Sequence, residues 1–366
     1  MGISVAMIVK NEEQNIERAI RSAWPSASEI IVVDTGSTDH TKEIANDLGA
    51  TVYDFEWTNS FSDARNFSID KCDHPWVLIL DADEELFMRD HGLIWNAPYM
   101  ECGAFYSPLR NYFLDGNQAT VDVACVQNTD ANYPLTHKYP YYAELKVIRM
   151  FRNDGNIRFT GRIHELLDTS IREHDIKVGD AQFVIHHHGK AMLDREQAKR
   201  QPYLDMTQAE AYENPDNPQL WFNYVMQAAA ANRYDLALEG GLKYLEIEKG
   251  GPSFIWMAVG MGFLSKGMAN RALHAFDTVL AVQPTHTTVL NRRAVALGML
   301  GRTEEARKGF LMAIRSNPGF ITSYVNLAEL ESHIGNRQGA SRAIRMGLSV
   351  APSDPVLLRS ALVFGS

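Results

Sequence analysis

Short apolar runs alternate with amphipathic stretches over the first eighty residues of the chain. The apolar runs predict strands at 3–9, 29–34, 51–56 and 76–81. Between the first two runs, Ile16, Ala19, Ile20 and Ala23 recur at helical spacing. Strands and helices that alternate in this way predict an α/β domain with a mostly parallel sheet, whose ligand site lies at the carboxyl ends of the strands.

The pattern changes after about residue 95. The segment 96–146 is rich in aromatic residues and has no clear period, so we expect a loop-rich insertion or acceptor loops there. Strand-like pieces then resume at KVIRMF (146–151) and continue to QFVIHHHG (182–189).

Beyond Arg195 the apolar spacing is helical throughout and repeats every 34 residues. Three sets of residues recur at this period: Pro284, Pro318 and Pro352; Gly267, Gly301 and Gly335; Ala272, Ala306 and Ala340. Small residues let two antiparallel helices approach, glycine marks the turn between them, and proline ends the second helix. With a weaker unit at 217–250, the sequence predicts about four tetratricopeptide-like repeats in an all-α superhelix. We therefore expect an α/β domain at 1–195, and a helical linker with repeats at 196–366.

The charge is uneven along the chain. Residues 1–195 hold 30 Asp and Glu against 18 Lys and Arg. This acidic half disfavours nucleic acid and anionic membranes as partners and suits a site for a divalent cation. Three cysteines without paired spacing and an N-terminus without a signal-peptide pattern predict a cytoplasmic protein, and the lack of an apolar run of about 18 residues predicts no transmembrane segment.

One acidic motif follows a buried strand directly. In LILDADEEL, Asp81 and Asp83 flank Ala82 at the strand end. One carboxylate of such a pair can coordinate a hard divalent cation while the other holds a ribose or a metal-bound water. Acidic loops after strands are common and are mostly just solvated, so this motif by itself does not identify a metal site. The neighbouring motifs decide how it is interpreted.

That context is a series of motifs in a fixed order. MIVKNEE, VVDTGSTD, FSDARN, LDADEEL and GRIHELL resemble the family 2 glycosyltransferases with the GT-A fold, and the whole chain is similar to their subgroup with C-terminal tetratricopeptide repeats. The resemblance implies an inverting transferase that moves a hexosyl or N-acetylhexosaminyl group from a nucleotide diphosphate donor. A UDP-sugar is the favoured donor, and Mn²⁺ or Mg²⁺ is the expected cofactor.

The resemblance also implies where the donor binds. The loop after the first strand and the acid that ends the second grip the nucleotide base, which corresponds here to Val9, Asn11, Glu12 and Asp34. A carboxylate at Asp34 can accept from a ring N–H of uracil or guanine, and Gly36 and Ser37 permit close backbone approach. TGSTD can equally serve as a turn and helix N-cap.

Two further residues are assigned to the donor. Arg65 resembles the family's arginine near the diphosphate, where a guanidinium can pair with a phosphate. A surface salt bridge is the alternative for Arg65. Asp81 is the acid of the D-x-D motif that holds the ribose or a metal-bound water.

The resemblance places Glu165, in GRIHELL, near the acceptor as the general base. The alternatives are that Glu165 caps a helix or pairs with Arg162, and His164 is the fallback base. A histidine two residues before Gly189 completes the metal site opposite Asp83 in the related pattern, which selects His187. His and Asp together suit Mn²⁺ as well as Mg²⁺, although a lone histidine is more often a packed structural residue.

Repeat arrays present concave surfaces to peptides and proteins, so we expect a protein or peptide acceptor. Glycans and modified DNA bases remain open as acceptors, and so does a homo-oligomer. A non-catalytic scaffold that binds partners through its repeats is the competing function. Nucleotidyl transfer would need a glycine-rich basic phosphate loop, which KNEEQN is not.

Overall fold

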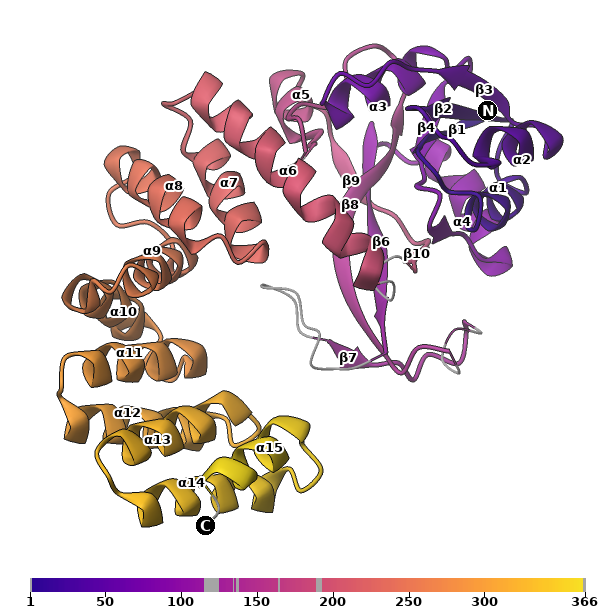
Figure 1. Cartoon of the computed structure of the whole chain (residues 1–366). Coiled ribbons are helices and arrows are strands. Elements are labelled where there is room, and N and C mark those ends of the chain that lie inside the picture. The colour runs from indigo at the N-terminus through magenta and orange to yellow at the C-terminus, as the bar shows by residue number, and fades with distance from the viewer. Residues whose placement is uncertain are drawn as a thin grey trace. The chain divides into compact units, whose positions relative to one another are not determined.

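The computed structural model describes residues 2–114, 125–133, 135, 138–163, 165–188 and 193–364, the last range without the side chains of 193–199. Two compact units make up the chain, Met1–Lys199 and Arg200–Ser366. Figure 1 shows a sheet flanked by helices in the first unit and an array of helices in the second. In the described ranges, no helix has both the length and the apolar character needed to cross a bilayer.

A single twisted sheet organises the first unit. The strands are β1 (Ile3–Val9), β2 (Glu29–Asp34), β3 (Thr51–Asp54), β4 (Trp76–Ile79), β5 (Glu84–Glu85), β6 (Ala104–Phe113), β7 (Val126–Gln127), β8 (Tyr141–Arg152), β9 (Val178–Asp180) and β10 (Ile185–His187). Their order is β3-β2-β1-β4-β8-β6-β10-β5, with β7 beside β8 and β9 beside β6. The run β3-β2-β1-β4 is parallel, as the sequence predicts, so the carboxyl ends of β1, β2 and β4 lie at one edge.

Helices cover both faces of this parallel run. They are α1 (Ile16–Ala23), α2 (Thr41–Asp47), α3 (Phe61–Asp70), α4 (His91–Asn96) and α5 (Asp168–Glu173), with short 3-10 turns at Met88–Asp90 and Ala97–Tyr99. Alternate residues of β1 enter different cores: Met7 packs in the cluster that contains α1, and Ala6 in the cluster that contains Ile69 of α3. Burial on both faces explains why β1 reads as a continuous apolar run.

The segment 96–146 is more regular than the sequence predicts. Strands β6 and β8 form a long antiparallel pair in which Phe113 lies opposite Tyr141 and Ala104 opposite Phe151. The expectation of a loop-rich segment was therefore wrong for 104–113 and 141–146. Buried positions within β6 include the polar Ser107 and Asn111, so the sequence lacks the apolar–polar alternation that reveals a half-buried strand.

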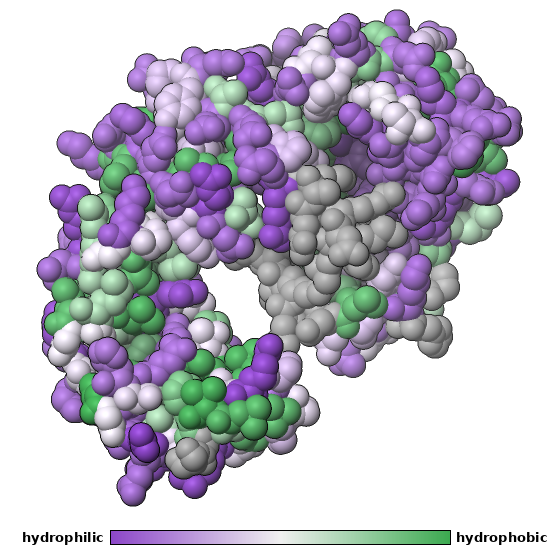
Figure 2. All heavy atoms as spheres, in the orientation of Figure 1, coloured by the Kyte–Doolittle hydropathy of each residue, from purple (hydrophilic) through white to green (hydrophobic). Residues whose placement is uncertain are grey.

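The second unit is built from helical pairs. The helices are α6 (Leu193–Glu213), α7 (Pro218–Ala230), α8 (Tyr234–Ile247), α9 (Ser253–Ser265), α10 (Ala269–Val282), α11 (Thr287–Met299), α12 (Thr303–Ser316), α13 (Ile321–His333), α14 (Arg337–Val350) and α15 (Pro355–Phe364). Helices α7 to α14 pack as four successive pairs, and α15 follows them. Figure 2 shows hydrophobic residues gathered on the surface of the last helices, among which Leu362 is 87% exposed.

The periodic residues have the roles that the sequence predicts. Gly267, Gly301 and Gly335 lie in the turns within the pairs with φ between +72° and +79°, a region that favours glycine. The three prolines follow closely after the ends of α10, α12 and α14, and the three alanines are buried. The first pair has Asn232, at φ +57°, in its turn, which explains why that unit looks degenerate in the sequence. The unit is an all-α array of the tetratricopeptide type.

Candidate active site

The loops after β1 and β2 are joined by polar side chains. The backbone N–H of Asn11 donates to the Ser37 hydroxyl at 2.8 Å, and the Asn11 side-chain oxygen accepts from the Thr38 backbone N–H at 2.8 Å. The backbone N–H of Glu12 donates to the Thr41 hydroxyl at 2.7 Å. Val9, at the end of β1, lies opposite Asp34 in register. The structure therefore brings together the residues assigned from the sequence to the nucleotide base.

Asp34 is a buried carboxylate at the end of β2, only 1% exposed. Its Oδ2 accepts from the backbone N–H groups of Gly36 and Ser37, at 3.0 and 2.9 Å, so the loop is also a turn. Its Oδ1 is buried and has no hydrogen-bond partner among the described residues. Buried polar atoms are normally paired, so this oxygen is an acceptor with an unused hydrogen-bonding position.

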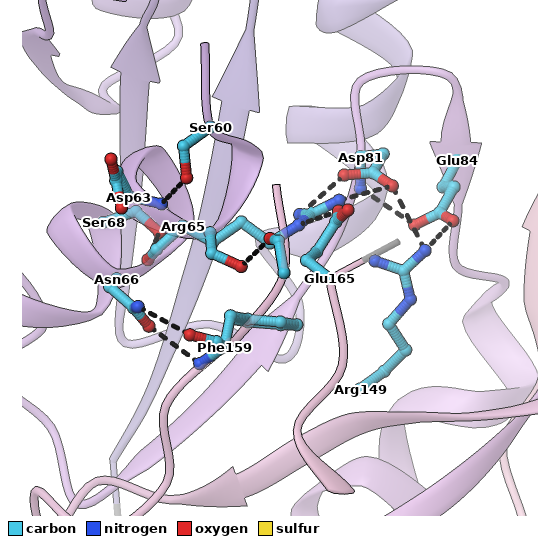
Figure 3. Close-up of polar contacts among 12 residues, drawn as sticks. Ser60, Asp63, Arg65, Asn66, Ser68, Asp81, Glu84, Arg149, Phe159 and Glu165 are labelled. Carbon is cyan, nitrogen blue, oxygen red and sulfur yellow. Dashed lines mark hydrogen bonds and ion pairs between the residues drawn. The ribbon is translucent and has the colours of Figure 1, made fainter. Parts of the chain in front are cut away.

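Arg65 links two of the predicted motifs, as Figure 3 shows. Its Nη1 lies 3.0 Å from Oδ1 of Asp81, and its Nε donates to Oε1 of Glu165 at 2.8 Å. The Arg65 side chain is 8% exposed, which excludes the surface salt bridge. Burial works against its charge, but the two carboxylates outweigh burial and raise the pKa of Arg65 above its ordinary value.

The loop that carries Glu165 is fixed to helix α3. The side chain of Asn66 donates to the Phe159 carbonyl at 3.0 Å and accepts from the Phe159 N–H at 2.9 Å. These bonds and the Arg65 pair hold FSDARN against GRIHELL (Figure 3). Glu165 forms an ion pair with Arg65, and the sequence did not predict this pair. His164 lies outside the described residues.

Sequence reasoning missed two charged residues of this cluster. Nη2 of Arg149, from β8, donates to Oδ2 of Asp81 at 3.1 Å and to Oε1 of Glu84 at 2.6 Å. Arg149 and Arg65 thus flank Asp81 (Figure 3). The sequence did contain a signal for Arg149, which is an arginine within the apolar run KVIRMF. A charged residue in a buried strand is normally paired with an opposite charge.

Burial and charge act in opposite directions on the two acids of this cluster. Burial favours neutral Asp81, but Arg65 and then Arg149 outweigh it and hold the pKa of Asp81 well below its usual range. Burial raises the pKa of Glu84 to about 7, an effect that Arg149 opposes and Asp81 reinforces. Asp81 is therefore the permanently charged member.

The two predicted metal ligands are neighbours. Nε2 of His187 lies 3.1 Å from Oδ2 of Asp83, because β10 pairs antiparallel with β5 just after the D-x-D motif. Nδ1 of His187 lies 2.6 Å from Oδ1 of Asn111, its register partner on β6. Because Nδ1 is hydrogen-bonded to an oxygen, Nε2 is the ring nitrogen that could bind a metal ion. Burial lowers the pKa of His187, but the hydrogen bond and charge of Asp83 raise it overall.

Asp83 and His187 offer two side chains of the kinds that bind divalent cations. Carboxylate and imidazole together suit Mn²⁺. In the ranges that the structure describes, no group of three or more His, Cys, Asp or Glu side chains converges on one point. A cation held by Asp83 and His187 would therefore have positions left for water and for the donor's diphosphate.

The neighbouring histidines have structural partners instead. His186 is fully buried with Nδ1 2.7 Å from the Tyr112 hydroxyl, and burial lowers its pKa to about 3. Nε2 of His188 lies 2.9 Å from Oε2 of Glu85. Of the three histidines in the run, His187 is the one whose side chain contacts the D-x-D motif.

The comparison with known families confirms the N-terminal resemblance. Residues 4–90 match the family model described as "Glycosyl transferase family 2". The N-terminal unit carries a family 2 glycosyltransferase domain. The match covers β1 to β5 and thus Asp34, Arg65, Asp81 and Asp83, whereas Glu165 and His187 lie beyond it.

The chain is also similar to individual proteins. It is 34% identical to a TPR repeat-containing protein of Synechococcus elongatus over 46% of this chain and 36% of that protein. It is 30% identical to the SPbeta prophage-derived glycosyltransferase SunS of Bacillus subtilis over 44% of this chain and 34% of that one. These matches span about a third of each relative. A thermophilic TPR protein of Thermus thermophilus covers 46% of this chain and 92% of its own, at 19% identity and a TM-score of 0.38.

Proposed function

We propose that the chain is a metal-dependent inverting glycosyltransferase that uses a UDP-sugar to modify a protein or peptide. The observation that supports this most is that one buried guanidinium, Arg65, bonds both the first acid of the D-x-D motif and the candidate base Glu165. Arg65 thus joins the D-x-D motif, whose Asp83 contacts His187, to the loop that carries the candidate base.

In the proposed reaction, the acceptor hydroxyl, thiol or amine attacks the anomeric carbon of the sugar. A bond forms from the acceptor atom to that carbon as the bond from the carbon to the diphosphate oxygen breaks, and its electron pair leaves with the nucleoside diphosphate. Glu165 takes the proton of the acceptor. A bound Mn²⁺ or Mg²⁺ would supply charge neutralisation at the diphosphate.

The chain's own residues have distinct parts in this scheme. Asp34 offers its unpaired Oδ1 to a ring N–H of the uracil, and Asp81 is oriented by two arginines toward the ribose side of the site. Asp83 and His187 hold the cation. Attack opposite the leaving group inverts the configuration of the sugar carbon.

The other parts of the proposal concern the setting of the reaction. The sugar is a hexose or N-acetylhexosamine, and the repeats recruit the acceptor through their concave surface. A reducing compartment such as the cytoplasm is the proposed setting, because the three cysteines lack paired spacing in the sequence.

The test is hydrolysis of a panel of UDP-, GDP- and dTDP-sugars by the full chain without an acceptor. We expect slow release of UDP in Mn²⁺ that stops on chelation with EDTA. A chain that binds none of these nucleotides and hydrolyses none of the sugars would be the scaffold that the sequence left as the alternative.

A further inference from the structure

A cavity of about 240 Å³ lies beside the candidate base. Its wall includes Arg65 and Glu165, the aromatic rings of Tyr106 and Phe159, and Leu166. The metal ligands Asp83 and His187 are not part of this wall. The cavity therefore lies on the Glu165 side of the site, where the proposed reaction needs its acceptor, and its volume is below the usual range for a whole small-molecule ligand.

Four consecutive residues of β8, from Lys146 to Arg149, also line the cavity. Side chains alternate between the faces of a strand, and here Val147 packs toward the core cluster of α1 while Ile148 packs toward that of Phe159. Tyr106, the register partner of Ile148 on β6, lines the cavity on the face that the two strands share. Arg149 contacts Asp81, which follows β4, so the cavity also borders β8 on its β4 side.

On its β4 side, the middle part of β8 has no neighbouring strand among the described residues. On the opposite side β6 pairs with β8 between Tyr141 and Phe151. On the other side β7 pairs only at Tyr141 and Tyr142, and β4 only from Met150 to Arg152. Within the described residues, no backbone hydrogen bond other than those to β6 involves 143–149. About half of the N–H and C=O groups in this stretch therefore point to an unpaired edge.

We propose that the acceptor is an extended peptide that adds as a strand to this open edge of β8, at 143–149, and places one side chain in the cavity beside Glu165. This inference rests on the proposed function and specifies its substrate class and docking mode. Main-chain bonds to the edge would supply affinity with little dependence on sequence, and the cavity would select the side chain that enters it.

The edge itself favours a peptide over other acceptors. Donors and acceptors that alternate at the spacing of a strand match another peptide backbone, whereas a glycan or a nucleic acid does not present that pattern. The continuity of the edge with the Glu165 cavity favours an acceptor over a second copy of the chain. The charged Glu144 and Lys146 limit unselective strand addition at this edge.

The cavity wall indicates the kind of side chain that enters. The wall combines the apolar groups of Phe159, Ile148 and Leu167 with the carboxylates of Glu165 and Asp168. A side chain with a nucleophilic tip on a short stem would suit both kinds of group. A peptide with serine, threonine or cysteine at the entering position is the expected ligand.

The probe is an array of synthetic ten-residue peptides of varied sequence, prepared with ordinary amides and with alternate backbone amides N-methylated. The full chain is applied with Mn²⁺ and UDP, and binding is read directly, so it does not depend on turnover. We expect captured peptides to weaken about tenfold on N-methylation in one alternating register, since each methyl removes a main-chain donor. Equal binding by both forms would exclude strand addition.

Hydrogen–deuterium exchange then locates the peptide. Amides in 143–149 should exchange more slowly with a captured peptide present. Those of β3, an edge strand separated from β8 by β2, β1 and β4, should not change. Unchanged exchange at 143–149 would overturn the docking mode. So would a dimer in which these amides are protected before any peptide is added.

A matched pair of variants tests the cavity. Leu166 is 52% exposed at the cavity wall, and Leu114 is 60% exposed just beyond the end of β6 and away from that wall. Leu166→Arg should reduce peptide capture at least about tenfold, Leu114→Arg should keep it, and melting curves should show both variants folded. Equal peptide capture by the two variants would mean that the cavity does not take part in peptide binding. Wild-type donor hydrolysis, measured separately, reports on the glycosyltransferase function alone.

Discussion

The guanidinium of Arg65 and the carboxylate of Glu165 form a 2.8 Å hydrogen bond between groups that are 100 residues apart in the chain. One oxygen of Glu165 is thereby committed to Arg65, which fixes the orientation of the carboxylate toward the cavity. The same bond gives Glu165 a structural role beside its proposed catalytic role, so variants must separate the two.

Glu165→Gln should lower kcat by roughly 10² to 10⁴ with little change in the donor KM. The amide oxygen of glutamine can still accept from Arg65, but the side chain cannot take a proton. The melting temperature should therefore change little. Steady-state kinetics with a peptide acceptor and a thermal unfolding curve check the two effects.

The control for this variant is Glu173→Gln, at the exposed end of α5. It removes the same charge from the same unit without approaching Arg65 and should leave kcat unchanged. A folded Glu165→Gln chain with normal kcat would exclude Glu165 as the base, and His164 would be tested next.

Asp83→Ala should remove tight Mn²⁺ binding and transfer while the fold persists. Asp83 is partly exposed beyond the buried strand, so its loss removes a ligand and no core packing. Electron paramagnetic resonance of Mn²⁺ with the chain measures binding without turnover. Asp47→Ala, at the exposed end of α2, is the matched control. Mn²⁺ affinity equal in both variants would refute the metal site.

Asp34→Asn should raise the donor KM at least about tenfold, which corresponds to about 1.4 kcal/mol, with kcat nearly unchanged. One oxygen of the asparagine can still accept from Gly36 and Ser37, so the turn is kept. The amide nitrogen then replaces the unpaired oxygen and faces the ring N–H as a second donor. Donor titrations by calorimetry check the affinity directly, and an unaltered value would place the base elsewhere.

Arg149→Met should destabilise the first unit by about 1–3 kcal/mol, because it leaves the buried Glu84 side chain without one of its hydrogen-bond donors. The double variant Arg149→Met with Glu84→Gln should recover a large part of this loss, since the neutral amide needs no counter-charge. Urea unfolding followed by tryptophan fluorescence measures both. A double variant as unstable as the single one would mean that Arg149 acts mainly through Asp81.

Two glycines in one repeat make a matched test of backbone conformation. Gly301, at φ +72° in the turn between α11 and α12, should cost about 1–2 kcal/mol when changed to alanine. Gly298, inside α11, has room for a methyl group 3.5 Å from Leu330, so Gly298→Ala should stabilise the unit by about 0.5–1 kcal/mol. Equal effects of the two changes on thermal unfolding would contradict the assigned turn geometry.

Local chemistry determined much of this protein, and that part could be predicted from the sequence. The apolar runs of β1, β2 and β4 identify buried parallel strands, because a strand covered on both faces must be apolar throughout. The 34-residue period identifies the helical pairs, because the turns within three of them adopt the left-handed φ that favours glycine and because proline cannot continue the helix that it follows. Asp34, Asp81 and Asp83 could be selected because each stands at or just after the end of such a strand.

The tertiary structure alone decided which of these residues meet. No local pattern predicts that Arg65 lies between Asp81 and Glu165, that Arg149 pairs with Glu84, or that Asn111 holds His187. Those pairs depend on the order of the strands in the sheet and on the register of β5, β6 and β10. The open edge of β8 also depends on strand pairing, since it exists only where β4 and β7 end. Pairing between strands that are far apart in the sequence is not encoded in either strand by itself.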